Sequence, residues 1–174
     1  METIRCKNNF GKIVNIEKEK FVFRPSAYGL ILHKGKIVTL KNKSNKKIWF
    51  PGGGIEIGER MEQGLLREIK EETGLKVKIK KLIFSKENFF YYQPLDEAYH
   101  AFLFFYLCEP IKTRMISDEE VQDYESEKPR WTEIKKIKKE DISDLNDEIF
   151  SVLNNLKKLA GSQLSVRTLG TLMH

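Results

Sequence analysis

The sequence predicts an α/β domain in which helices flank a mixed β-sheet. Strand-like runs rich in Val, Ile, Phe and Tyr occupy both halves of the chain, with one helix-like segment between them. A second amphipathic segment follows the last strand-like run. Strands and helices do not alternate regularly, as they would in a doubly wound parallel sheet. At 174 residues and 40% hydrophobic composition, the chain is long enough to form one domain with a proper core.

The first 54 residues are predicted to form strands joined by turns. Residues 1–20 are polar and alternate poorly, so they predict at most a short leading strand or an arm. Residues 34–36 (Lys-Gly-Lys) form a tight-turn sequence between two strand-like runs. The predicted strands are residues 21–23, 27–33, 37–40 and 48–50. The last of these stops at Pro51 and three glycines.

A helix is predicted at residues 61–73. Met61, Leu65 and Ile69 recur every four residues and mark one buried stripe, and Gly74 stands where a helix commonly ends. The later elements are two strand-like stretches within 77–92, strands at 99–107 and 129–134, and an amphipathic helix within 141–160. We therefore expect one domain over residues 1–160, followed by a tail, residues 161–174, that is flexible or only locally ordered.

The net charge of +6 is unevenly distributed. Residues 1–50 hold 12 Lys and Arg against three Asp and Glu, a net charge of +9, whereas the remainder holds 19 against 22, a net charge of −3. A basic segment beside a carboxylate-rich centre suits an anionic substrate held against a metal, and a solvated lysine-rich surface explains the pattern equally well. Nucleic acid is a conceivable partner, but no recognition motif for it is present.

Location and thiol chemistry are constrained by what the sequence lacks. No N-terminal stretch combines a basic start with a long apolar segment, and the apolar run 101–108 is too short to cross a bilayer as a helix. We therefore expect a cytoplasmic protein without membrane association. The two cysteines, Cys6 and Cys108, form no metal-spaced pair, and Cys108 lies in an apolar run typical of a buried thiol.

The clearest chemical feature is the acidic face of the predicted helix 61–73. Glu68, Glu71 and Glu72 stand at i, i+3 and i+4 and share this face. Their mutual repulsion is relieved by a hard divalent cation such as Mg²⁺ or Mn²⁺, which prefers oxygen ligands. Such a face alone is usually only solvated. The glycines that precede the helix add a backbone able to approach a ligand closely or offer a carbonyl to a metal.

The spacing around this face carries a family resemblance. Gly53 is followed by five residues and Glu59, then by seven residues and the run Arg67-Glu-Ile-Lys-Glu-Glu-Thr-Gly-Leu75. This segment resembles the signature of the Nudix hydrolases, Gx5Ex7REUxEExGU with U bulky and aliphatic, at every defined position. The preceding Trp-Phe-Pro-Gly at residues 49–52 is also similar to that family.

The resemblance implies a fold and an activity. The fold is an αβα sandwich around a mixed sheet, with the motif as a loop–helix–loop metal site. The activity is metal-dependent hydrolysis, with Mg²⁺ or Mn²⁺, of a phosphoric anhydride bond in a nucleoside diphosphate derivative. By motif position, the expected metal ligands are Glu71, Glu72 and the carbonyl of Gly53. Glu68 is expected to bind metal through water or to act as the base, and Arg67 to orient a neighbouring glutamate. Glu59 is expected to pair with Arg67 or to hold the loop, and Gly74 to end the helix.

Residues outside the motif complete the predicted site. In this family the base, or an extra metal ligand, is often an acidic residue before a late strand. Glu125 is the first choice for this role, and the alternatives are Glu127, Glu119 and Glu120. Each of these acids fits a plain solvent-facing loop as well.

Arg24 is a candidate phosphate contact and fits a plain surface arginine equally well. The aromatic cluster Phe89, Phe90, Tyr91 and Tyr92, with Gln93, is a candidate for stacking on a base and also fits the core. Phe89 and Tyr91 are the candidates chosen from this cluster.

The predicted substrate is a nucleotide, with a nucleoside triphosphate preferred. The alternatives are a nucleotide sugar, a dinucleoside polyphosphate, a capped RNA end, or a non-catalytic nucleotide sensor. The expected assembly is a monomer or a homodimer.

Overall fold

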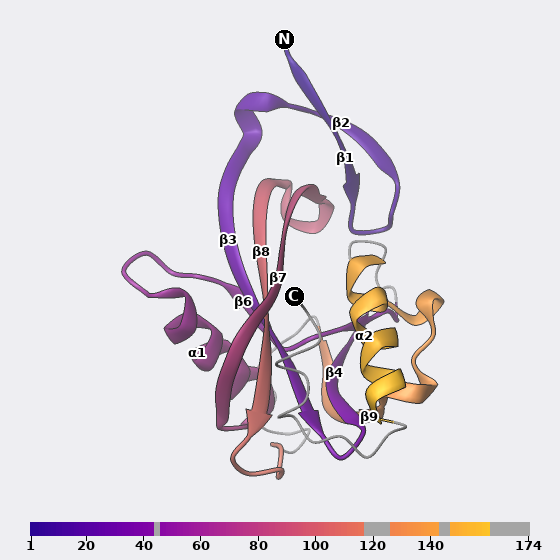
Figure 1. Cartoon of the computed structure of the whole chain (residues 1–174). Helices are drawn as coiled ribbons and strands as arrows, with labels where there is room; N and C mark the ends of the chain where they lie inside the picture. The colour runs from indigo at the N-terminus through magenta and orange to yellow at the C-terminus, as the bar shows by residue number, and fades with distance from the viewer. Residues whose placement is uncertain (44–45, 117–125, 143–146, 161–174) are drawn as a thin grey trace.

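The computed structural model describes residues 1–43, 46–116, 126–142 and 147–160. These residues contain two α-helices and nine strands (Figure 1). The strands are β1 (Thr3–Asn8), β2 (Ile13–Glu17), β3 (Phe21–His33), β4 (Lys36–Asn42), β5 (Ile48–Trp49), β6 (Gly52–Gly54), β7 (Val77–Tyr92), β8 (Glu97–Pro110) and β9 (Ser126–Glu133). The helices are α1 (Met61–Thr73) and α2 (Asp147–Ala160). Helix α1 covers the predicted range 61–73.

The strands form one mixed sheet. Its order is β2-β1-β7-β8-β3-β4-β5, with β6 paired to β3 and β9 paired to β4. The pairs β1–β7 and β3–β8 are parallel, and the other pairs are antiparallel. Figure 1 shows α1 and α2 on opposite sides of the sheet. The predicted αβα sandwich is thereby confirmed.

The sheet buries both faces, as the alternation along β3 shows. Tyr28 and Leu30 belong to a core on the α2 side, which includes Ile149 and Leu153. Residues of β3 with the other parity contribute to a second core on the α1 side; its buried members are Ala27, Ile31, Val38, Leu65, Ile69, Leu75, Val77 and Cys108. This division follows from the two-residue period of a strand, which points successive side chains to opposite faces.

Gly29 brings α1 close to the sheet. A Cβ atom at this position would lie 2.7 Å from Cδ1 of Ile69, so any side chain here would push the helix away. Ile69 is itself fully buried and belongs to the same turn of helix as Glu68. The distance between α1 and β3, and with it the depth of the glutamate face, therefore depends on this glycine.

Some elements differ from the sequence prediction. Residues 1–20 hold a complete antiparallel hairpin, β1–β2, where a short leading strand or an arm was predicted. Residues 77–92 form one strand, whose pairing with β8 shifts register between Ile79 and Lys81 and again between Leu82 and Phe84. Such irregularities break the alternation of side chains, and for this reason the sequence suggested two stretches. Helix α2 lies within the predicted range 141–160, and a 3₁₀ turn occupies Lys139–Asp141.

Both cysteines are buried free thiols, as expected for Cys108. Burial raises the pKa of the Cys108 thiol to about 12, which keeps it protonated and unreactive. Of the helices that the structure describes, none has the length and apolar character needed to cross a membrane.

Two adjacent leucines of α1 test the orientation of this helix. Leu65 is 0% exposed and Leu66 is 41% exposed. We expect Leu65→Ala to lower the free energy of unfolding by about 2–5 kcal/mol, because it leaves a cavity between α1 and the sheet. Leu66→Ala, the matched control, is expected to change it by less than about 1 kcal/mol. Urea denaturation of both variants measures the difference, and equal losses would contradict the packing of α1.

Candidate functional site

Helix α1 presents its acidic face beside the glycine strand β6. The helix begins after Arg60, whose backbone N–H donates to Oε1 of Gln63 at 2.9 Å. It ends at Gly74, which adopts the left-handed conformation with φ 69°. Because Leu65 and Ile69 are buried against the sheet, the positions of Glu68 and Glu72 are fixed on a different face.

The glycines of β6 allow close contact on two sides. Gly52 has φ 140°, and a Cβ atom there would lie 2.1 Å from the carbonyl oxygen of Ala27 on β3. A Cβ atom on Gly53 would lie 2.8 Å from the carboxylate carbon of Glu68. Only glycine lets the backbone reach both the neighbouring strand and the acidic face of the helix.

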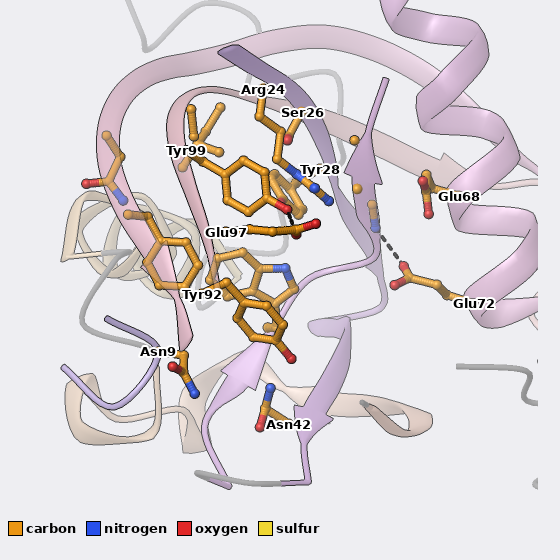
Figure 2. Close-up of a pocket in the computed structure, with 18 of the residues that line it drawn as sticks. Asn9, Arg24, Ser26, Tyr28, Asn42, Glu68, Glu72, Tyr92, Glu97 and Tyr99 are labelled. Carbon is orange, nitrogen blue, oxygen red and sulfur yellow. Dashed lines mark hydrogen bonds between the residues drawn. The ribbon is translucent and has the colours of Figure 1, made fainter. Parts of the chain in front are cut away.

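Glu68 and Glu72 therefore lie directly against β6. The backbone N–H of Gly52 donates to Oε2 of Glu72 at 2.7 Å, and Figure 2 shows both glutamates on the same side of the glycine strand. Carboxylate and backbone carbonyl oxygens are the ligands that Mg²⁺ and Mn²⁺ prefer. The donor set of these glutamates, Glu71 and the Gly53 backbone fits a divalent cation of this class.

Arg67 donates hydrogen bonds to three acidic residues of this region and forms an ion pair of 3.9 Å with a fourth, Glu56. Its guanidinium donates to both carboxylate oxygens of Glu59, at 2.8 and 3.0 Å, to Glu68 at 2.9 Å and to Glu71 at 3.1 Å. A further N–H donates to the carbonyl of Gly54 at 3.2 Å. The hydrogen bonds that Arg67 donates to Glu59, the largest contribution, and to the other acids hold the pKa of Arg67 above its ordinary value. In turn, the hydrogen bond from Arg67 lowers the pKa of Glu59.

Glu68 is a partly buried acid of the helix face. Burial raises the pKa of its carboxyl group, and the nearby Arg67 guanidinium only partly opposes this shift. Within the residues that the structure describes, no three carboxylate, imidazole or thiol groups converge on one point. Glu68 and Glu71 accept hydrogen bonds from Arg67, whereas Glu72 accepts one from Gly52. All three carboxylates nevertheless belong to one helix face.

A pocket of about 630 Å³ opens beside the glutamates. Its floor is the face of the sheet that carries Tyr28, Ala101 and Leu103, and β6 forms part of its rim. The polar and aromatic side chains of the walls come from five strands and two connections between strands; they include Asn9, Arg24, Ser26, Asn42, Lys47, Trp49, Asn88, Phe90, Tyr92, Glu97 and Tyr99 (Figure 2). A pocket of this size and mixed lining is typical of small-molecule sites.

Arg24 lies between the glycine strand and the aromatic wall. Its guanidinium carbon is 4.6 Å from the centre of the Tyr99 ring, a cation–π contact. A Cβ atom on Gly54 would lie 3.4 Å from an Arg24 nitrogen. The structure thus places the predicted Arg24 in the pocket wall, next to the strand that the glutamates contact.

The two aromatic residues predicted from the sequence as substrate contacts do not line this pocket. Phe89 and Tyr91 have the opposite parity on β7 from the lining residues Phe90 and Tyr92. Phe89 stacks on His100 with ring centres 4.3 Å apart, and the hydroxyl of Tyr91 donates to Asp96 at 2.7 Å. Of the predicted aromatic cluster, Phe90 and Tyr92 line the pocket, whereas the chosen candidates Phe89 and Tyr91 do not.

Several site residues were missed or remain unplaced. Trp49, Asn42 and Lys47 line the pocket, and no local sequence pattern distinguishes them from ordinary strand and loop residues. Asn9 belongs to a turn that the sequence did not predict. The predicted base Glu125 and the alternatives Glu119 and Glu120 lie outside the described residues. The fourth candidate, Glu127, is opposite Lys41 in the β9–β4 ladder.

Comparison with known proteins identifies the family. The NUDIX domain model matches residues 22–153, which is most of the chain. The chain belongs to the Nudix hydrolase family. Among solved structures, the chain is similar to a Nudix hydrolase from Nitrosomonas europaea, with a TM-score of 0.59 and 16% identity over 84% of this chain and 95% of that one. At this identity the similarity supports the fold alone.

Two curated relatives carry different substrates in their names. The ADP-ribose pyrophosphatase of Methanocaldococcus jannaschii is 40% identical over 74 residues, which cover 40% of this chain and 44% of the relative. The 8-oxo-dGTP diphosphatase of Escherichia coli is 26% identical over 113 residues, covering 63% and 76%. The chain thus matches less than half the length of the first relative.

The contact between Gly53 and Glu68 yields a prediction about metal binding by this Nudix motif. We expect Gly53→Ala to weaken Mn²⁺ binding about tenfold or more, because the new methyl group displaces the Glu68 carboxylate. Gly54→Ala is the matched control, since its methyl group meets only the flexible end of Arg24. Titration of Mn²⁺ followed by electron paramagnetic resonance measures both affinities. Equal affinities of the two variants would contradict the assignment of Gly53 to the metal site.

Proposed function

We propose that residues 1–160 form one domain that hydrolyses a phosphoric anhydride bond in a nucleoside diphosphate derivative, with a nucleoside triphosphate as the first candidate. One observation carries the proposal: the acidic face of α1 lies against β6 at the edge of an aromatic pocket of about 630 Å³. Such a pocket has the size for a nucleotide, and the glutamates lie where its phosphate groups meet the rim.

The residues of α1 and β6 have different roles at the reacting bond. When bound, Mg²⁺ or Mn²⁺ neutralises charge on the phosphate oxygens and makes a nucleophile of water. Glu71, Glu72 and the Gly53 carbonyl would hold this cation. Arg67 fixes the rotamers of Glu68 and Glu71 through hydrogen bonds of 2.9 and 3.1 Å, so these carboxylates keep one direction.

The pocket walls would hold the remainder of the nucleotide. Arg24 supplies a permanent positive charge beside β6, where a phosphate group would lie. Phe90, Tyr92 and Tyr99 supply aromatic rings along the wall, and such rings stack on nucleobases of any kind. Charge near the glutamates and aromatic surface farther away match the two ends of a nucleotide.

Alternative substrates differ in the group beyond the scissile bond. The M. jannaschii relative is named for ADP-ribose and the E. coli relative for 8-oxo-dGTP, so both a nucleotide sugar and a triphosphate belong in the first test. A capped RNA end and a dinucleoside polyphosphate complete the panel. A non-catalytic sensor is disfavoured because the motif keeps Glu68, Glu71 and Glu72. Identification of both products, with Mg²⁺ or Mn²⁺ present, distinguishes all of these substrates.

The panel also has defined outcomes for the metal. A triphosphate substrate would yield a monophosphate and pyrophosphate, whereas ADP-ribose would yield AMP and ribose phosphate. Addition of EDTA is expected to stop turnover, and excess Mg²⁺ to restore it. Absence of turnover on every substrate with either metal would refute the proposed activity.

Glu72 provides the sharpest single variant. We expect Glu72→Gln to reduce turnover about 100-fold or more, because the amide loses the negative charge that a cation requires. Glu62→Gln on the same helix is the matched control, since Glu62 is exposed and does not line the pocket. Initial rates on the best substrate of the panel, with circular dichroism to verify folding, measure the effect. Unchanged turnover in Glu72→Gln would overturn the assignment of the metal ligands.

A further inference from the structure

The β1–β2 hairpin precedes the part of the chain that matches the Nudix family. The family match begins at residue 22, whereas β1 and β2 end at Glu17. The hairpin nevertheless joins the sheet, since β1 runs parallel to β7 with Lys7 opposite Phe90 and Asn8 opposite Tyr91. These pairs lie at the end of β1 that leads into the hairpin turn. The turn is therefore held beside the same segment of β7 that lines the pocket.

The side chain of Asn8 fixes the turn in place. Asn8 is only 4% exposed, and its Oδ1 accepts hydrogen bonds from the N–H groups of Phe10 and Lys12, at 3.0 and 2.9 Å. Its Nδ2 donates to Oε1 of Gln93 at 3.0 Å. Gln93 begins the 3₁₀ turn that joins β7 to β8. One buried amide thus shapes the hairpin turn and ties it to the tip of the β7–β8 hairpin.

The next residue, Asn9, faces the substrate pocket. It lines the pocket, and its Oδ1 accepts a hydrogen bond from the backbone N–H of Gln93 at 3.3 Å. Figure 2 shows Asn9 on the opposite side of the pocket from Glu68 and Glu72, with Tyr92 and Tyr99 between them. The hairpin therefore contributes to the end of the pocket that is remote from the acidic face.

The chemistry of this remote end suits a nucleobase. Phe90 and Tyr92 offer ring faces from β7, and Asn88 offers a second amide from the same strand. Aromatic faces stack on any base, whereas a side-chain amide carries both donors and an acceptor and so distinguishes base edges. The cation of Arg24 lies instead beside β6. Phosphate and base are thus assigned to opposite ends.

We propose that the β1–β2 hairpin is a specificity element that presents the amide of Asn9 to the edge of the substrate's nucleobase. Asn8 is the positioning residue, because it holds the turn but points into the sheet interface. This inference deepens the proposed function and rests on its assignment of the pocket to a nucleotide. It gives residues outside the family match a direct part in substrate selection.

A matched pair of asparagine variants in the same hairpin tests the inference. Asn9→Ala removes the amide from the pocket; Asn15→Ala removes an exposed amide on β2 that does not line the pocket. For Asn9→Ala we expect KM on the best substrate to rise about five- to 30-fold, the range for one lost hydrogen-bonding partner. The value of kcat is expected to stay within about twofold, and Asn15→Ala is expected to match the wild type.

Calorimetry with Mg²⁺ separates binding from turnover. The probes are the four ribonucleoside and four deoxyribonucleoside 5′-monophosphates, together with inorganic pyrophosphate. Asn9→Ala is expected to weaken the best-bound monophosphate by the same factor as KM and to reduce the differences among bases. Affinity for pyrophosphate is expected to be unchanged, because pyrophosphate has no base.

Asn8→Ala tests the positioning role by hydrogen exchange, which reports on the hairpin turn independently of activity. We expect the same direction of change in KM, accompanied by faster hydrogen exchange at the amides of Phe10 and Lys12, which lose their acceptor. Asn8→Asp, which keeps the acceptor oxygens, is expected to retain protection of these two amides. Loss of exchange protection without a rise in KM would contradict the link between the turn and the pocket.

The outcomes separate the inference from the proposed function. If the wild type hydrolyses nucleotides and Asn9→Ala behaves like Asn15→Ala, the inference is wrong and the proposed function stands. If the wild type binds monophosphates through Asn9 but hydrolyses nothing on the panel, the inference stands and the proposed function is wrong. If the wild type binds none of the eight monophosphates, the inference is overturned.

Discussion

The ion-pair network around Arg67 is the interaction on which the geometry of the site depends. One guanidinium joins Glu59 in the loop before α1, Glu68 and Glu71 on the helix and the carbonyl of Gly54 on β6. It thereby ties three consecutive segments together in a partly buried setting, where a charge-assisted bond is stronger than at the surface. A single positive charge among three carboxylates, with Glu72 nearby, leaves the region negative. A divalent cation bound here would neutralise this excess negative charge.

The Arg67 network can form only because the backbone segments on either side of α1 and β6 pack closely together. Gly29 lets α1 approach the sheet, and the glycines at 52 and 53 let β6 lie between β3 and the acidic face. The depth of burial that this packing creates also raises the pKa of Glu68. The same few contacts between helix, glycine strand and sheet therefore determine packing, electrostatics and the shape of the pocket rim.

The sequence predicted the parts of the structure that local patterns determine. Helix 61–73 was predicted with its correct bounds because its apolar period and terminal glycine are local signals, and the motif spacing identified the glutamate face. The four consecutive aromatic residues 89–92 give no local alternation, so the sequence could not indicate that Phe90 and Tyr92, rather than Phe89 and Tyr91, line the pocket. The β1–β2 hairpin and Asn9 were missed, since their place depends on pairing with a strand some 80 residues later.

The central claim is that this arrangement holds a divalent cation between α1 and β6. Crystals grown with Mn²⁺, measured near the manganese absorption edge, test it directly. The account predicts an anomalous peak about 2 Å from carboxylate oxygens of Glu71 or Glu72 and from the carbonyl of Gly53. Absence of a peak at this position, or a peak only at unrelated surface acids, would contradict it.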